Sequence, residues 1–77
     1  MLLSNIEIGN RAIIDDLSNL NSTIQRRLVD MGINEGVSIS LKRKLPFGGP
    51  FIIEVFGQSI SLRRLEASRI QVSLGEV

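Results

Sequence analysis

The chain has one pair of adjacent carboxylates, Asp15-Asp16. Paired carboxylates can exchange protons or bind hard cations. Neighbouring residues on a strand face opposite sides, so we do not expect these two to converge on one ion. The chain has no His and no Cys, and so lacks the usual general base at neutral pH and the soft ligands of transition metals. We therefore expect no enzyme activity, no catalytic residue, no cofactor and no dedicated metal site.

Basic side chains form two short clusters, Lys42-Arg43-Lys44 and Arg63-Arg64. Clusters of this kind can contact phosphates. Small barrels that bind single-stranded nucleic acid also use aromatic stacking platforms, and this chain has three Phe but no Tyr or Trp. The net charge is only +1. A solvated basic face is therefore favoured over a nucleic-acid-binding barrel, which is kept as an alternative.

The segment 51–56 is the strongest candidate for a contact surface. If Phe51, Ile53 and Val55 face the core, Ile52 and Phe56 must face outward, because side chains alternate along a strand. Together with Phe47 at a nearby loop tip, they would form an apolar patch of the kind that marks a binding surface. The opposite register, or a helix over this face, would bury the patch, and the sequence leaves that choice open.

One short helix is expected over residues 22–31. Ser22 and Gln25 fit a capping box at its start, and Gly32 fits the left-handed residue that follows a helix. The apolar residues share one helical face, which needs a core to lie on: Ile24, Leu28 and Met31.

Alternating or apolar segments predict short strands, separated by turns rich in Gly, Pro, Asn and Ser. Their expected ranges are 11–17, 37–44, 51–56, 59–62 and 70–72, with a Gly57-Gln58 hairpin turn and a helical turn at 63–68. So many short strands in 77 residues fit a single domain, residues 1–77, folded as a small SH3-like barrel closed on itself. No apolar run approaches the length of a membrane span, and no signal peptide is apparent, so we expect a cytoplasmic protein without direct membrane insertion.

Three segments together carry a family resemblance: RRLVDMGINEG (26–36), LPFGGPFIIEVFG (45–57) and SISLRRLEASRIQV (59–72). In this order and spacing they resemble the ferrous iron transport protein A family, over nearly the whole chain from Leu3 to Val72. The resemblance implies an SH3-like barrel and a bacterial cytosolic accessory protein of ferrous iron uptake. Its implied partner is the membrane ferrous iron permease, through either the cytosolic GTP-hydrolysing domain or the membrane part.

Our hypothesis is that the helix surface and the strand 51–56 patch bind that permease. The candidate partner-binding residues are Arg26, Arg27, Leu28, Met31, Phe47, Ile52 and Phe56. Leu28 is also expected in the core, from its helical phase. Arg26 or Arg27 could reach a phosphate as an arginine finger, although an exposed helical Arg is more often solvated. Alternatives are a stand-alone metal-responsive domain that binds a transition metal, and a weak homo-oligomer.

Overall fold

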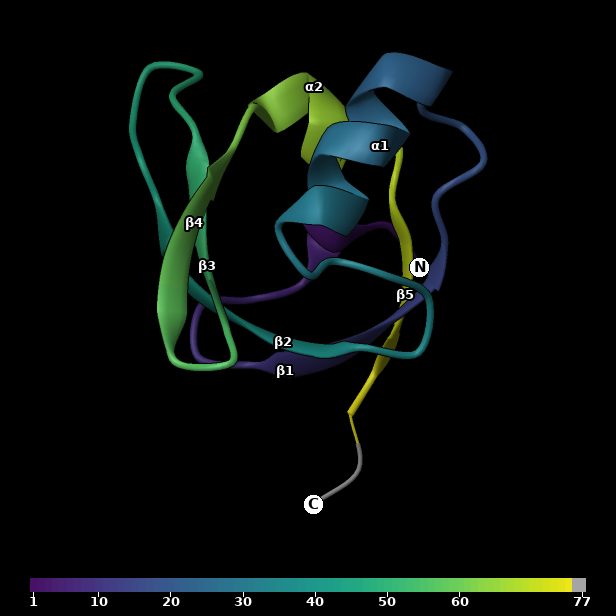
Figure 1. Cartoon of the computed structure of the whole chain (residues 1–77). Coiled ribbons are helices and arrows are strands. Elements are labelled where there is room, and N and C mark those ends of the chain that lie inside the picture. The colour runs from purple at the N-terminus through teal and green to yellow at the C-terminus, as the bar shows by residue number, and fades with distance from the viewer. Residues whose placement is uncertain (76–77) are drawn as a thin grey trace.

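Five strands form one antiparallel sheet in the order β4-β3-β2-β1-β5. The computed structural model describes residues 1–75. The strands are β1 (Arg11–Asp16), β2 (Ser38–Lys44), β3 (Phe51–Val55), β4 (Gln58–Leu62) and β5 (Gln71–Leu74). Figure 1 shows the sheet bent into a deep trough, with β3 and β4 on one side, β5 on the other and the helices across the opening. The mainly β, SH3-like fold is confirmed.

Two register shifts help to bend the sheet. One lies between Leu41 and Arg43, where β2 pairs with β3, and the other between Ile14 and Asp16, where β1 pairs with β5. An extra residue in one strand of a pair kinks that strand and increases its twist. The ladder does not close into a ring among the described residues, because β4 and β5 are its two edges. The prediction that closure removes the sheet edges is therefore wrong.

The structure decides the register of β3, which the sequence left open. Phe51, Ile53 and Val55 are buried, and Ile52 is only partly exposed. The hairpin turn after β3 lies one residue earlier than predicted. Val55 pairs with Gln58, so Phe56 and Gly57 form the turn, with φ of 51° and 79°. Positive φ at both central residues is the requirement of a type I′ hairpin turn, whose twist matches that of the strands.

The expected helix is present as α1 (Ser22–Asp30), but its cap differs from the prediction. The Asn21 side chain, rather than Ser22, accepts the hydrogen bond from the Ile24 N–H, at 2.9 Å. Gln25 Nε2 donates to the Leu20 carbonyl at 2.6 Å, so it does not close the predicted capping box. Gly32 follows the helix with φ of 89°, as expected.

Two shorter helical pieces complete the fold. The 3₁₀ helix η1 (Leu3–Asn5) carries the buried Leu3, and α2 (Arg64–Ala67) lies within the predicted helical turn. No helix among residues 1–75 is long and apolar enough to cross a bilayer.

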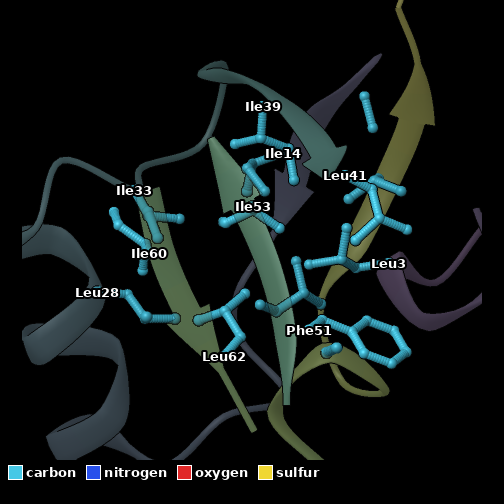
Figure 2. Packing of buried hydrophobic residues seen from close by; sticks show 14 of the residues in the cluster. Leu3, Ile14, Leu28, Ile33, Ile39, Leu41, Phe51, Ile53, Ile60 and Leu62 are labelled. Atoms are coloured by element: carbon cyan, nitrogen blue, oxygen red, sulfur yellow. The ribbon is translucent and has the colours of Figure 1, made fainter. Parts of the chain in front are cut away.

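The core fills the space between the sheet and α1. Leu28 of α1 and Ile33 just after it point toward Leu62 and Ile60 of β4, as Figure 2 shows. All of these side chains except Ile60 have no exposed surface, and Ile60 retains only 9%. Ile24 and Met31 pack against this core while remaining partly exposed, so the predicted apolar face of the helix is confirmed. Because α1 is held by its apolar face, its other faces are left for solvent or a partner.

Candidate interaction surface

Phe56 and the C-terminal end of α1 lie side by side. A Cβ built on Gly32 would be 3.7 Å from two carbons of the Phe56 ring. Gly32 directly follows Met31, which is itself partly exposed. The Phe56 ring is 79% exposed. We call Met31, Gly32 and Phe56 the helix-end surface; in it, Phe56 lies beside the residue that directly follows Met31, another sequence-predicted site residue.

Phe47 belongs to a different part of the molecule. It lies in the loop between β2 and β3, whereas Phe56 lies in the turn between β3 and β4, so the two are at opposite ends of β3. Figure 1 shows the β2–β3 loop on the side of the molecule where α2 lies, and the β3–β4 turn at the opposite end of these strands. Phe47 is fully exposed and also has a positive φ, 59°. The prediction of one continuous patch around Phe47, Ile52 and Phe56 is therefore wrong, because the length of the strand separates the two turns.

The structure places two further candidates less favourably for contact. Leu28 is 0% exposed, so it cannot touch a partner while the fold is intact, and its role is in the core. Ile52 is only partly exposed in the middle of β3, beside Ser61 of β4 in the register. Of the apolar candidates, only Phe47 and Phe56 have mostly exposed side chains.

The two predicted arginines have different surroundings. Arg27 Nη2 lies 2.5 Å from Glu66 Oε2, and this ion pair joins α1 to α2. The other Glu66 oxygen accepts a hydrogen bond from the Arg63 N–H at 3.0 Å. Glu66 is almost fully buried, and its charge is paired with that of Arg27 while both its oxygens accept hydrogen bonds. Arg26 is exposed, and the helical repeat places it on the face of Ser22 and Asp30, away from Met31.

Sequence reasoning missed the part played by α2. Its Arg64 Nη2 donates to the Leu45 carbonyl at 3.2 Å, which ties α2 to the β2–β3 loop. The Arg64 guanidinium also lies 4.9 Å from the centroid of the Phe51 ring, and Lys44 Nζ lies 5.5 Å from it. Leu65 is 63% exposed. The sequence LRRLEA of residues 62–67 gave no signal for this, because it does not reveal which side chain meets the loop.

The aspartate pair has local, structural roles. Asp16 accepts hydrogen bonds from the Ser18 N–H at 2.8 Å and from the Ser18 hydroxyl at 3.0 Å. The N–H bond, followed by the hydroxyl bond, lowers the pKa of the Asp16 carboxyl. Asp15 accepts instead from the Ser73 hydroxyl of β5, so the two carboxylates do have separate partners. Among residues 1–75, no three acidic side chains are grouped closely enough to hold a metal ion.

The strongly bent five-stranded sheet, with a short helix over its opening and two exposed Phe at turn tips, defines a small SH3-like domain. Residues 1–74 match the model of the FeoA domain. The chain belongs to this family.

Two solved structures have the same fold. The FeoA protein from Chlorobium tepidum is 31% identical, with a TM-score of 0.90; the match covers 96% of this chain and 70% of that one. The zinc-complexed FeoA of Stenotrophomonas maltophilia, described as an SH3 domain protein, is 29% identical, with a TM-score of 0.79, and the match covers 95% and 89% of the two chains.

A longer relative connects the family to transport. It is the Fe(2+) transport protein A/Fe(2+) transporter FeoB fusion protein of Porphyromonas gingivalis, 28% identical over 74 residues. The match covers 96% of this chain but 9% of the relative, so this chain corresponds to a small part of that protein. The FeoA family is thereby linked to ferrous iron transport.

Proposed function

We propose that this protein is a cytosolic accessory factor of ferrous iron uptake that acts by binding the ferrous iron permease. The observation that carries the proposal is the fusion relative, in which the counterpart of this chain and the transporter FeoB form one polypeptide. Domains fused in one organism and separate in another commonly act on each other. The surface chemistry supports a binding role, because the chain presents exposed aromatic side chains and no cluster of acidic side chains within residues 1–75.

The helix-end surface is the proposed contact. Phe56 offers a large, rigid apolar side chain, and aromatic residues supply much of the binding energy at protein interfaces. The Gly32 backbone lies close to one part of the ring, and the rest of the ring, which is mostly exposed, can contact a partner. Met31 adds an adaptable apolar edge. The expected partner surface is therefore an apolar pocket wide enough for one aromatic ring.

An arginine finger that acts on GTP hydrolysis would need a free arginine. Arg27 is committed to Glu66, so a trans-acting finger from this helix would be Arg26. Arg26→Ala should then slow hydrolysis by the permease without weakening the complex, and Arg26→Lys should not restore the rate, because a finger uses the planar guanidinium. An unchanged rate in Arg26→Ala would remove this part of the proposal.

The test is an NMR titration of the labelled protein with the soluble GTP-hydrolysing domain of the permease. Signals of Met31, Gly32 and Phe56 should shift, and Phe56→Ser should weaken binding at least about tenfold, the effect of about 1.4 kcal/mol. Phe47→Ser is the matched control, since it removes another exposed Phe with positive φ, at the other end of β3. Undiminished affinity of a folded Phe56→Ser protein would remove the helix-end surface from the interface. If the domain causes no shift at all, the same titration with the detergent-solubilised whole permease decides whether the membrane part binds; absence of shifts there too would overturn the proposed function.

A further inference from the structure

The two edge strands of the sheet, β4 and β5, differ in whether another segment of the chain lies along them. At β5, the N-terminal residues lie along the outer edge: Leu3 N–H donates to the Ile70 carbonyl at 2.9 Å, and Val72 N–H donates to the Met1 carbonyl at 2.7 Å. Leu2 also forms an isolated bridge with Gln71. At β4, the described residues supply no such cover, and its ladder partner is β3 alone. Figure 1 shows β4 at the margin of the sheet, away from the N-terminal segment.

Strand β4 also lacks the usual features that keep sheet edges apart. Natural edge strands carry charged side chains, Pro, a bulge or very short length. The sequence of β4 is Gln58-Ser59-Ile60-Ser61-Leu62, with no charge and no Pro. All five residues pair with β3 in regular register, without a bulge. The edge is therefore regularly paired, neutral and able to accept another strand.

The hairpin geometry fixes which backbone groups face outward. In a two-residue hairpin, the residues on either side of the turn exchange ladder hydrogen bonds, and here these are Val55 and Gln58. Bonded and non-bonded pairs alternate along an antiparallel ladder. Ile60 and Leu62 therefore bond to β3, whereas the N–H and C=O groups of Ser59 and Ser61 point away from the sheet. Both serines are exposed, so these outward N–H and C=O groups face water.

We propose that the β4 edge pairs with the β4 edge of a second copy of this chain, antiparallel and centred on Ile60. In that register Ser59 lies opposite Ser61 of the second copy, and Ser61 opposite its Ser59. The four outward groups of each strand then meet their counterparts, giving four backbone hydrogen bonds across the two-fold axis. The symmetric Ser-Ile-Ser sequence makes the edge complementary to itself, as an isologous interface requires.

The charges of the chain are compatible with this pairing. Along the chain, the basic residue nearest to β4 is Arg63, directly after Leu62. The proposed register places Arg63 opposite Gly57 of the second copy, so the two Arg63 residues are six positions apart along the ladder, about 20 Å. At physiological salt, repulsion over that distance is largely screened. A strand pair alone buries little surface, so the dimer is expected to be weak and concentration-dependent.

Sedimentation equilibrium of the whole chain tests the proposal. The average mass should rise from that of a monomer toward twice that value as the concentration approaches about 1 mM, the range of a weak complex. In hydrogen exchange at that concentration, the amides of Ser59 and Ser61 should become protected relative to a dilute sample. A strictly monomeric protein at about 1 mM would overturn the proposal.

Charge variants test the surface and the register together. Ser59→Lys/Ser61→Lys places like charges opposite each other and should abolish dimerisation, as should Ser59→Asp/Ser61→Asp. An equimolar mixture of the two variants should dimerise again, because each Lys then faces an Asp. Ser38→Lys, at an exposed position of the internal strand β2, is the control and should dimerise like the original chain.

Three outcomes would overturn the assignment. Dimerisation of the double-Lys variant, with its fold verified by circular dichroism, would place the contact on another surface. Failure of the mixture to restore the dimer would contradict the register centred on Ile60. Protection of the Ser59 and Ser61 amides only after addition of the permease domain would assign the edge to that partner instead of a second copy.

Discussion

Arg27 of α1 and Glu66 of α2 form an ion pair in which the guanidinium Nη2 and the carboxylate Oε2 are 2.5 Å apart. The Glu66 side chain is 5% exposed and the Arg27 side chain 46%. The same carboxylate bonds the N–H at the start of α2, so one buried charge both begins that helix and attaches it to α1. These contacts make Glu66 the link between the two helices over the sheet opening.

Arg27→Ala should destabilise the protein by about 1–2 kcal/mol, because it leaves the Glu66 charge buried without its cation. The loss is expected below the roughly 3–5 kcal/mol of a fully buried pair, since solvent already reaches Arg27. Urea unfolding measures the change. Arg26→Ala is the control on the same helix and should change stability by less than about 0.5 kcal/mol. Equal losses in the two variants would show that the ion pair contributes nothing.

Phe56→Asn should stabilise the protein while weakening its binding to the permease domain. Phe56 has φ of 51°, a left-handed conformation that costs most side chains about 1–2 kcal/mol and that Asn adopts more readily. The ring is mostly exposed, so little burial is lost with it. Thermal unfolding and the NMR titration give the two readouts. Phe47→Asn should stabilise similarly, because Phe47 has φ of 59°. A destabilised Phe56→Asn protein would mean that packing of the ring against Gly32 outweighs the backbone strain.

Asn21→Ala should destabilise the protein by about 1 kcal/mol, the usual effect of losing a helix cap. The Asn21 side chain satisfies the Ile24 N–H, which has no partner within the helix. Ser22→Ala is the matched control, because Ser22 is the first helical residue and no cap; it should be close to neutral. Chemical unfolding compares the two variants. A larger loss of stability in Ser22→Ala would show that Ser22 caps the helix, as the sequence suggested.

Asp16 should contribute to the pH dependence of stability. Its pKa is lowered in the folded protein because Ser18 donates two hydrogen bonds to the carboxylate. A lowered folded pKa means that the stabilisation is fully present above the unfolded pKa of about 3.9 and is lost as pH falls through the folded value. Unfolding curves between about pH 2 and pH 6 should therefore show a smaller acid-dependent loss of stability in Asp16→Asn. An unchanged pH profile would show that the Ser18 bonds do not distinguish the folded from the unfolded state.

The sequence by itself determined the elements and the buried face of the helix. Alternation in 51–55 indicated a strand with two distinct faces but left open which of them is buried, whereas the spacing of Ile24, Leu28 and Met31 set the face of α1 that meets the core. Gly32 marked the end of that helix. These features depend on periodicity and on the conformational freedom of glycine, both of which are local properties. The same letters carried the family resemblance, which the FeoA domain match confirmed.

Only the tertiary structure decided how those elements meet. It separated Phe47 from Phe56 by the length of β3 and placed the Phe56 ring beside Gly32, which is far from it in sequence. Across 39 positions of the chain, it paired Arg27 with Glu66. It left β4 open while the first residues cover β5. Such contacts depend on the bend of the sheet and on the path of the connecting segments, which no local sequence pattern specifies.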